Sequence, residues 1–355
     1  MLDAVRPPGG VVDLAWEDAM HNDKTLRKYV SSGGTTVYKL PVEAFPNHVT
    51  NCYLVMADPI TLLDTASGWE TANKELVKCF EGISDEFGEK LTLKDVGRVI
   101  ITHGHIDHFG GVNFVVEESA AELCIHELDA SVIQHFRERL LYSTTHVHLF
   151  LMRSGLPAER VDALIQMNKW SKDTYRSRAV DATFTEGPVL DGPLIAYHVP
   201  GHCPGQVCLQ LDDLLFTADH VLSHVTPNQS PESITRYTGV GHYMESLRKI
   251  KTLPGIRIGL GGHENEMEEL TARIDDTLRF HESRLEKTLT ILDEPKTIAE
   301  LSFGLFGERV DYHILLALLE TGAHLEYLYE RGKAVVVNID EVELDPTTVP
   351  VYQRV

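Results

Sequence analysis

Thr102-His103-Gly104-His105-Ile106-Asp107-His108-Phe109-Gly110-Gly111 directly follows the apolar run GRVII (97–101), which has the composition of a buried strand. Four metal-binding side chains thus fall within six residues, where the chain leaves a sheet and loop side chains can converge. In extended backbone His103 and His105 share one side of the chain and can bind one metal. Asp107 and His108 lie past the turn and can bind a second. We therefore expect a metal site here rather than an ordinary polar loop.

Three further candidate ligands each follow a β-type run: His202 in VPGHCPGQ, Asp219 in LLFTADHVL and His263 in IGLGGHE. Taken alone, each would more often be a structural residue. Together with the first group they complete a usable ligand set, because all are expected at the same edge of the sheet.

The expected arrangement has two metal ions. His103, His105 and His202 would bind one ion, whereas Asp107, His108 and His263 would bind the other. Asp219 would bridge them, and a hydroxide or water would fill the open positions. Asp107 is the candidate catalytic residue, because a hydrogen bond from the hydroxide would let it take the proton. Histidine and carboxylate ligands without thiolate suit Zn²⁺, with Fe or Mn as alternatives.

The motifs HGHIDH, PGHCPG, TADH and GGHE together resemble those of the metallo-β-lactamase-fold hydrolases. The similar branch contains hydroxyacylglutathione hydrolase and ribonuclease-like endonucleases. NCYLV (51–55) and LDT (63–65) are also similar to this family, and the resemblance covers residues 36–290. It implies an α/β fold, a four-layered αβ/βα sandwich, and its dinuclear site agrees with the ligand assignment above.

Changes in sequence character predict three regions. Residues 1–35 form an N-terminal extension, 36–292 the catalytic domain, and 293–355 a C-terminal module. Within the catalytic domain, 128–178 has helical periodicity and few strand signals, so we expect a helical insertion over the metal edge. The C-terminal module is predicted as three helices and a short β-pair, with HLEYLYERG (324–332) as the last helix. It resembles the winged-helix-like module of a subgroup that includes an endoribonuclease and enzymes acting on acyl or thioester substrates.

The chain is acidic, with 32 Lys and Arg against 53 Asp and Glu and a formal net charge of −21. This charge repels phosphate backbones and anionic membranes at long range, so a nucleic-acid partner is disfavoured. The C-terminal module lacks the basic face of a groove-reading helix and is expected to pack on the catalytic domain or to form a homodimer contact. No apolar run is long enough to span a membrane, and five scattered cysteines indicate reduced thiols in a cytoplasmic protein.

Several other residues have competing interpretations. Cys203, beside His202, is expected to pack rather than to bind metal, and Asp64 either orients a ligand histidine or is a turn residue. The remaining weighed histidines are expected to be structural or to support ligands: His126, His198, His220, His224 and His242. Candidate contacts to an anionic substrate, with solvated surface positions the commoner interpretation, are Arg153, Arg176, Arg178, Arg236 and Tyr237.

The predicted function is metal-dependent hydrolysis of a small ester, a lactone or an acyl-CoA or acyl-glutathione thioester. Apolar residues of the insertion would line an acyl pocket: Leu140, Leu141, Leu149, Phe150, Leu151 and Met152. The alternatives are a phosphodiesterase or endoribonuclease, a protein that mainly binds a ligand or partner, and a mononuclear iron oxygenase. Metal-ligand motifs define the chemistry and leave the substrate open.

Overall fold

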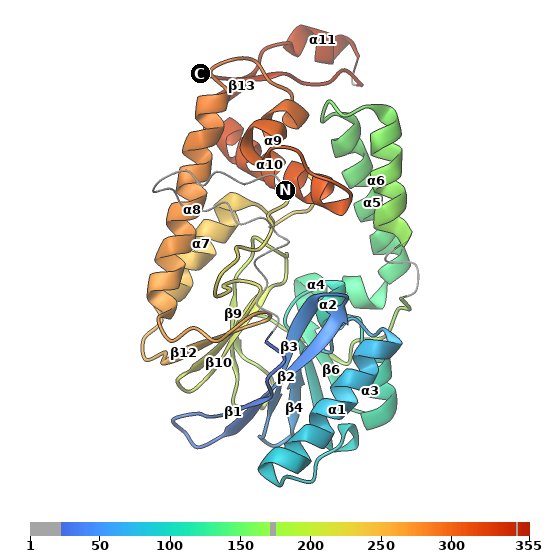
Figure 1. Ribbon diagram of the computed structural model, residues 1–355, viewed down its shortest axis with the longest axis vertical. Coiled ribbons are helices and arrows are strands. Elements are labelled where there is room, and N and C mark those ends of the chain that lie inside the picture. The colour runs from blue at the N-terminus through green and yellow to red at the C-terminus, as the bar shows by residue number, and fades with distance from the viewer. Residues whose placement is uncertain (1–22, 171–174, 346) are drawn as a thin grey trace, which may run out of the picture.

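Two β-sheets form the centre of the protein. The computed structural model describes residues 23–170, 175–345 and 347–355 (Figure 1). The larger sheet follows chain order, antiparallel from β1 to β4 and parallel from β4 to β7. Its strands are β1 (Arg27–Val30), β2 (Thr36–Phe45), β3 (His48–Val55), β4 (Thr61–Leu63), β5 (Arg98–Ile101), β6 (Glu122–His126) and β7 (Ala182–Phe184).

The smaller sheet has the order β12-β11-β10-β9-β8, with only the β11–β12 pair parallel. Its strands are β8 (Gly187–Pro188), β9 (Ile195–His198), β10 (Val207–Leu211), β11 (Leu214–Ala218) and β12 (Ile258–Gly261). Both sheets are therefore mixed, and the parallel segments leave several strand ends at one edge.

Period-two alternation along the strands produces the layers. In β3, Tyr53 and Val55 pack into the core between the sheets, whereas Cys52 and Leu54 pack into the outer core beneath the helices. That outer core includes α1 (Glu70–Phe87) and α3 (Val112–Ser119). On the other side, α7 (Val240–Lys251) and α8 (Leu270–Ile291) cover the smaller sheet. The predicted four-layered αβ/βα sandwich is confirmed.

The predicted insertion over residues 128–178 contains α4 (Glu127–Gln134), α5 (Phe136–Met152) and α6 (Ala158–Trp170). The helices α5 and α6 lie beyond the sheet edge that carries α2 (Ile106–Phe109), together with the C-terminal α9 (Ile298–Phe306) and α10 (Tyr312–Glu330) (Figure 1). Helix α10 contacts α6, α7, α8 and α9. No helix in the described part of the chain is long and apolar enough to cross a membrane.

The C-terminal region is helical, but its element order differs from the prediction. Residues predicted as two helices form the single helix α10, and Gly322 lies inside it. This glycine permits close packing, because a β-carbon there would lie 2.7 Å from the ring of Phe150 in α5. The strands β13 (Ala334–Val336) and β14 (Tyr352–Arg354) pair antiparallel, with α11 (Ile339–Leu344) between them in the chain.

The predicted N-terminal extension contributes to the sheet itself. β1 pairs antiparallel with β2, from Arg27 opposite Lys39 to Val30 opposite Thr36. The larger sheet therefore includes part of the region assigned to the extension, and residues 1–22 lie outside the described residues. A short 3₁₀ helix, Leu93–Asp95, precedes β5.

Two glycines of the motif hold α2 against the loop after β4. A β-carbon on Gly110 would lie 2.2 Å from the Ser67 carbonyl oxygen, and one on Gly111 would lie 2.2 Å from that of Thr65. The His108 carbonyl also accepts a hydrogen bond of 2.7 Å from the Thr65 amide. This close approach sets the position of the short helix that carries Asp107 and His108.

We predict that Gly111→Ala lowers the free energy of unfolding by roughly 2 kcal/mol or more, because the new methyl group has no space beside the Thr65 backbone. Urea unfolding measures the change. Gly82→Ala in α1 is the matched control: its β-carbon would meet only the flexible end of Leu26, at 3.3 Å, and alanine is the better helix former. Equal stability of Gly111→Ala and wild type would contradict the close contact.

Candidate metal centre

The Asp219 carboxylate, directly after β11, lies among four imidazole rings. Its Oδ2 is 3.9 Å from His103 Nε2, 3.7 Å from His202 Nε2 and 3.3 Å from His263 Nε2. Its Oδ1 is 3.3 Å from His108 Nε2. These side chains follow different strands, so the two sheets together build the cluster.

Two candidate ligand groups meet at Asp219. His103, His105 and His202 form one group with Asp219, and His108 and His263 form another with the same carboxylate. Asp107 joins the second group, with its Oδ2 3.4 Å from His263 Nε2 and 3.6 Å from His108 Nε2. The structure thus brings all seven sequence-predicted ligands together.

The donor atoms fit bound cations. Within the described chain, His103 Nε2 and His202 Nε2 are buried and have no hydrogen-bond partner, which is costly without a compensating ligand. The opposite ring nitrogens of two ligands donate to backbone carbonyls: His202 Nδ1 to Asn228 at 2.9 Å and His263 Nδ1 to Val49 at 2.7 Å. Protonation at Nδ1 leaves the Nε2 lone pair free to bind a metal ion.

The two groups differ in electrostatics. Burial, followed by the neighbouring His108, lowers the pKa of His103 well below its ordinary value, and burial with His202 lowers the pKa of His105 to about 3. Burial alone would lower the pKa of His263, but Asp219 and Asp107 raise it to about 10. The histidines of the first group are therefore neutral, as metal binding requires. In the second group, a cation would have to displace a proton from His263.

Residues 46–263 match the model of the metallo-beta-lactamase superfamily. The chain belongs to this superfamily. The predicted superfamily membership is therefore confirmed, whereas the branch within it stays a prediction. The chain is a metallo-hydrolase of this superfamily, and its clustered histidines and carboxylates are candidate metal ligands.

Relatives within the superfamily cover most of the chain. A metallo-beta-lactamase family protein from Thermus thermophilus is 27% identical with a TM-score of 0.72, covering 90% of this chain and 98% of that one. The Bacillus subtilis protein named "Probable metallo-hydrolase YqjP" is 23% identical, over 78% of this chain and 86% of its own length. An Aspergillus fumigatus atrochrysone carboxyl ACP thioesterase is 27% identical, over 60% of this chain and 56% of its own length.

Asp64 combines the two roles left open for it. Its φ of 61° is that of a turn residue. Its Oδ2 accepts hydrogen bonds of 2.8 Å from His108 Nδ1 and from the Thr102 hydroxyl, and its Oδ1 accepts one of 2.8 Å from the Thr102 amide. The carboxylate thus orients His108 and fixes the start of the histidine motif.

The candidate metal groups of the described residues do not include Cys203 or the five histidines that were expected to be structural or supporting, His126, His198, His220, His224 and His242. Burial, and then Asp129 and Asp219, raises the pKa of Cys203 well above its ordinary value, as expected for a packed thiol. His126 stacks on His198 with ring centroids 4.3 Å apart. His242 Nε2 lies 3.1 Å from Glu232, His220 is buried, and His224 contacts Ser223.

Sequence reasoning missed His48 and Asp129. His48 Nε2 lies 2.8 Å from Asp107 Oδ2, but His48 begins β3 whereas the recognised ligands follow strands. Asp129, in α4, accepts hydrogen bonds from the Gly104 amide at 2.8 Å and the Gly205 amide at 2.9 Å. It therefore links the loop of His103 and His105 to the loop of His202.

The described residues contain two further candidate groups. One joins His48 to Asp107 and His263, and the other, His281, Glu320 and His324, is a hydrogen-bonded network. His281 Nδ1 and His324 Nε2 are 3.1 Å apart, and Glu320 already pairs with Arg284 at 2.6 Å. A cation would compete with this guanidinium, so we do not assign a metal there.

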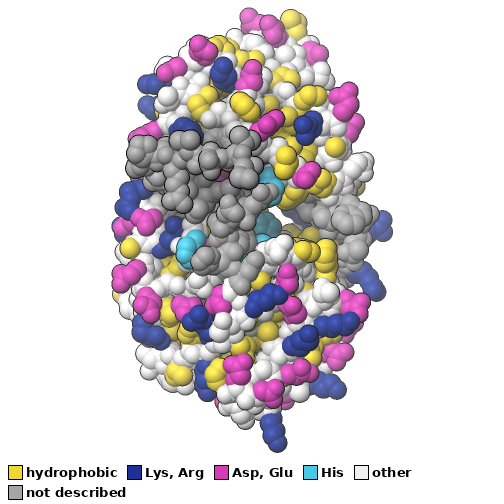
Figure 2. Space-filling model, in the orientation of Figure 1, with side chains coloured by type: hydrophobic (Ala, Val, Ile, Leu, Met, Phe, Trp, Pro, Cys, Tyr) yellow, Lys and Arg dark blue, Asp and Glu magenta, His cyan; other side chains and the backbone are white. Residues whose placement is uncertain are grey.

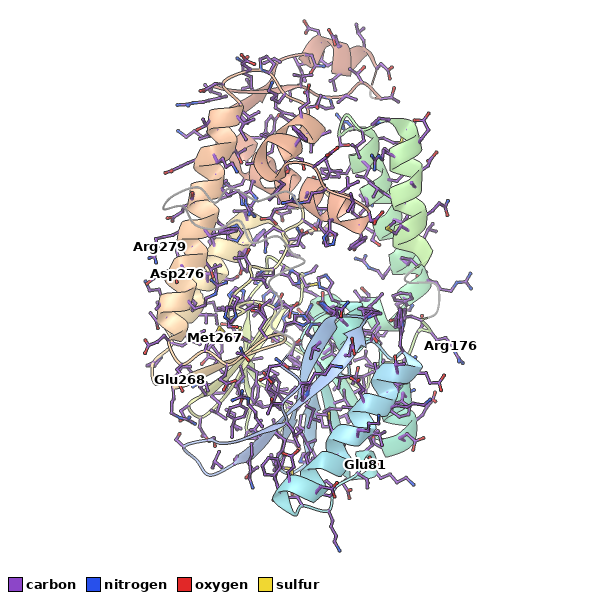
Figure 3. The ribbon with its side chains drawn as sticks, in the orientation of Figure 1. Glu81, Arg176, Met267, Glu268, Asp276 and Arg279 are labelled. Atoms are coloured by element: carbon purple, nitrogen blue, oxygen red, sulfur yellow. The ribbon has the colours of Figure 1, made fainter. Side chains whose placement is uncertain are left out.

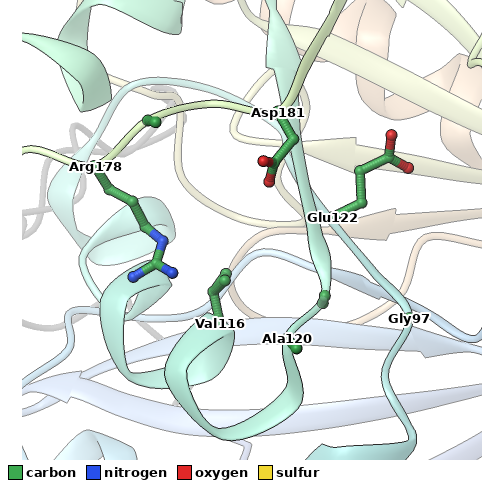
Figure 4. Close-up of a pocket in the computed structure, with 8 residues that line it drawn as sticks. Gly97, Val116, Ala120, Glu122, Arg178 and Asp181 are labelled. Atoms are coloured by element: carbon green, nitrogen blue, oxygen red, sulfur yellow. The ribbon is translucent and has the colours of Figure 1, made fainter.

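Histidine side chains are visible at a hollow between the sandwich and the helical region (Figure 2). Two arginines of the insertion do not point towards this cluster. Arg176 extends away from the sheets (Figure 3), and Arg178 pairs with Glu117 at 3.8 Å. Arg178 also lines a pocket of about 560 Å³ beside Gly97 and Glu122, at the start of β6 (Figure 4). This pocket is at the opposite end of the strand from the cluster.

The proposed acyl lining is only partly available. Leu151 is fully buried in the core, Phe150 and Leu140 pack against buried cores, and Phe150 meets α10 at Gly322. Leu141, Leu149 and Met152 are 69%, 54% and 46% exposed. Half of the predicted lining is therefore used for packing within the fold, Leu140 against the outer core of the larger sheet, and Phe150 and Leu151 against the core that contains α10.

We predict a pH-dependent stability contribution from Asp129. Burial raises its pKa from 3.8 to about 6, so the unfolded chain loses this proton first as pH rises. The protonated carboxyl therefore favours the folded state below pH 4, and this benefit, roughly 3 kcal/mol, is lost as pH rises through 6.

Urea unfolding of wild type and Asp129→Asn, with chelator present throughout, tests this effect because the variant has no carboxyl to titrate. The stability of wild type relative to the variant should fall between pH 4 and pH 6.5. A pH-independent difference would show that burial does not raise this pKa.

Proposed function

We propose that this metallo-hydrolase binds two divalent cations, Zn²⁺ in preference to Fe or Mn, and hydrolyses a small acyl thioester, ester or lactone. The first cation would be held by His103, His105 and His202, and the second by Asp107, His108 and His263. Asp219 would be shared between them. The observation that carries the proposal is the cluster of buried metal-binding side chains around this one carboxylate, in which His103 Nε2 and His202 Nε2 have no hydrogen bond.

When bound, the two cations would lower the pKa of a shared water towards neutrality and polarise the substrate carbonyl. Asp107 accepts the proton of the attacking water. Its neighbour His48 is 27% exposed at the side chain, which gives this proton a route to solvent. The water oxygen bonds to the carbonyl carbon and the bond from that carbon to sulfur or oxygen breaks. The leaving thiolate or alkoxide takes up the proton that Asp107 accepted, or one from solvent, and the products are a carboxylic acid and a thiol or alcohol.

Two phenols support an approach between the larger sheet and the helical region. Burial, and then the charge of Asp107, raises the pKa of Tyr175, whereas Tyr312 is 39% exposed. Tyr175 lies in the insertion, after α6, and Tyr312 begins α10. Tyr175 packs against Phe109 and Phe136, so an acyl substrate that approaches from this side would pass an aromatic surface.

A thioester is favoured over a polyanion. The thioesterase among the relatives acts on an acyl carrier protein, as its name states. The segment 324–332 would be the groove-reading helix of a nucleic-acid-binding module. In the structure, its residues His324, Leu325 and Leu328 are buried within α10 and could not contact a groove. The surface pocket between α7 and α10 is lined by Glu232, Glu245, Glu326 and Glu330 together with Arg331. Its carboxylates outnumber the one guanidinium and would repel a phosphate backbone.

We predict that His103→Ala and Asp219→Ala lower hydrolysis of acyl thioesters by about 100-fold or more, because each removes a group that binds the activating cations. The assay compares acyl-CoA and acyl-glutathione thioesters, p-nitrophenyl esters, lactones, bis-p-nitrophenyl phosphate and single-stranded RNA, with and without chelator. Elemental analysis of the same samples should give two metal equivalents for wild type and fewer for the variants.

Cys203→Ala is the matched control, because this thiol adjoins His202 without belonging to the ligand groups; it should keep the full metal content. Undiminished activity in both ligand variants would refute the hydrolase proposal. RNA cleavage faster than thioester cleavage would replace the proposed substrate class with a polynucleotide.

A further inference from the structure

A buried ion pair joins α8, which covers the smaller sheet, to the C-terminal helix α10. Arg284 in α8 donates from Nη1 to Glu320 Oε1 in α10 at 2.6 Å, and the two side chains are 9% and 2% exposed. The guanidinium also lies over the rings of Phe280 and Phe306, at 4.2 and 4.9 Å from their centroids. The Glu320 carboxylate is therefore held in one place by a fixed partner.

The second oxygen of Glu320 binds the loop after Asp219. Glu320 Oε2 accepts hydrogen bonds from the Gln229 amide at 2.7 Å and from Asn228 Nδ2 at 3.4 Å. Asn228 Nδ2 also donates to the Leu316 carbonyl of α10 at 3.0 Å. Helix α10 thus fixes both the backbone and a side chain of this loop.

The same loop orients a candidate metal ligand. The Asn228 carbonyl accepts the 2.9 Å hydrogen bond from His202 Nδ1. Because a carbonyl can only accept, the proton must be on Nδ1, and Nε2 faces Asp219 Oδ2 at 3.7 Å. The carbonyl therefore sets both the tautomer and the orientation of the ring.

We propose that Glu320 is a positioning residue for His202, so that docking of the C-terminal helix α10 sets the strength of one metal site. This inference rests on the proposed role of His202 as a ligand. It assigns the C-terminal region a function at the metal centre although Glu320 belongs to a helix remote in sequence. Loss of the Glu320 charge frees the loop and lets the His202 ring turn away from its binding orientation.

The test measures Zn²⁺ affinity by competition with a chromophoric chelator, together with the absorption spectrum of the Co²⁺-substituted protein. Of the two Zn²⁺ affinities, Glu320→Gln should lower by about 10-fold or more the one that His202→Ala also lowers. It should also change the Co²⁺ spectrum. Asn228→Ala removes the side-chain contact to α10 and keeps the Arg284–Glu320 pair. It carries the same expectation if Glu320→Gln fails to fold.

Leu301→Ala is the control for general destabilisation, because Leu301 is fully buried in the same helical region and is not among the hydrogen-bond partners of the loop. It should lower the unfolding midpoint and leave both Zn²⁺ affinities unchanged. Wild-type affinities in Asn228→Ala and in folded Glu320→Gln, or an equal loss in Leu301→Ala, would overturn the positioning role. If His202→Ala itself left Zn²⁺ binding intact, the proposed metal centre would fail instead.

Discussion

The carboxylate of Asp219 imposes the main constraint on this protein. It is buried within 3.3–3.9 Å of four imidazole nitrogens, and burying so many polar groups is unfavourable unless each has a partner. The strands therefore end together at one edge, and residues outside the cluster fix the ring orientations. Asp64 does this for His108, and the carbonyls of Val49 and Asn228 do it for His263 and His202.

The sequence was most informative where several ligands follow strands at short spacing. HGHIDH predicted a metal site, and its combination with His202, Asp219 and His263 predicted the residues that the structure brings together. His48 escaped this reasoning because it begins a strand, so no rule about strand ends applies to it. Asp129 escaped because its partners are the amides of Gly104 and Gly205, and a hydrogen bond to a distant backbone amide leaves no pattern in the sequence.

The helical region was predicted in kind but not in detail. Local signals gave helices in the insertion and in the C-terminal part, since helical periodicity depends on neighbouring residues. The segment 324–332 was predicted as a separate helix, but it belongs to α10, and Gly322 lies inside that helix. Its lack of a side chain serves the contact with Phe150. The apolar residues of α5 similarly divide between the core and the surface, and only the tertiary arrangement decides which side of the helix is covered.

One hydrophobic core runs from the smaller sheet through α7 and α8 to α9 and α10, and it includes residues of α5 and α6. The C-terminal helices are consequently an integral part of the fold and not an exchangeable attachment. Because this core is shared, a substitution of an inward-facing residue in α9 or α10 would change the stability of the whole fold. The exposed face of α5, with Leu141 and Leu149, is free of that restriction. We therefore expect divergence among close relatives to concentrate on this outer face, with the apolar interior varying little.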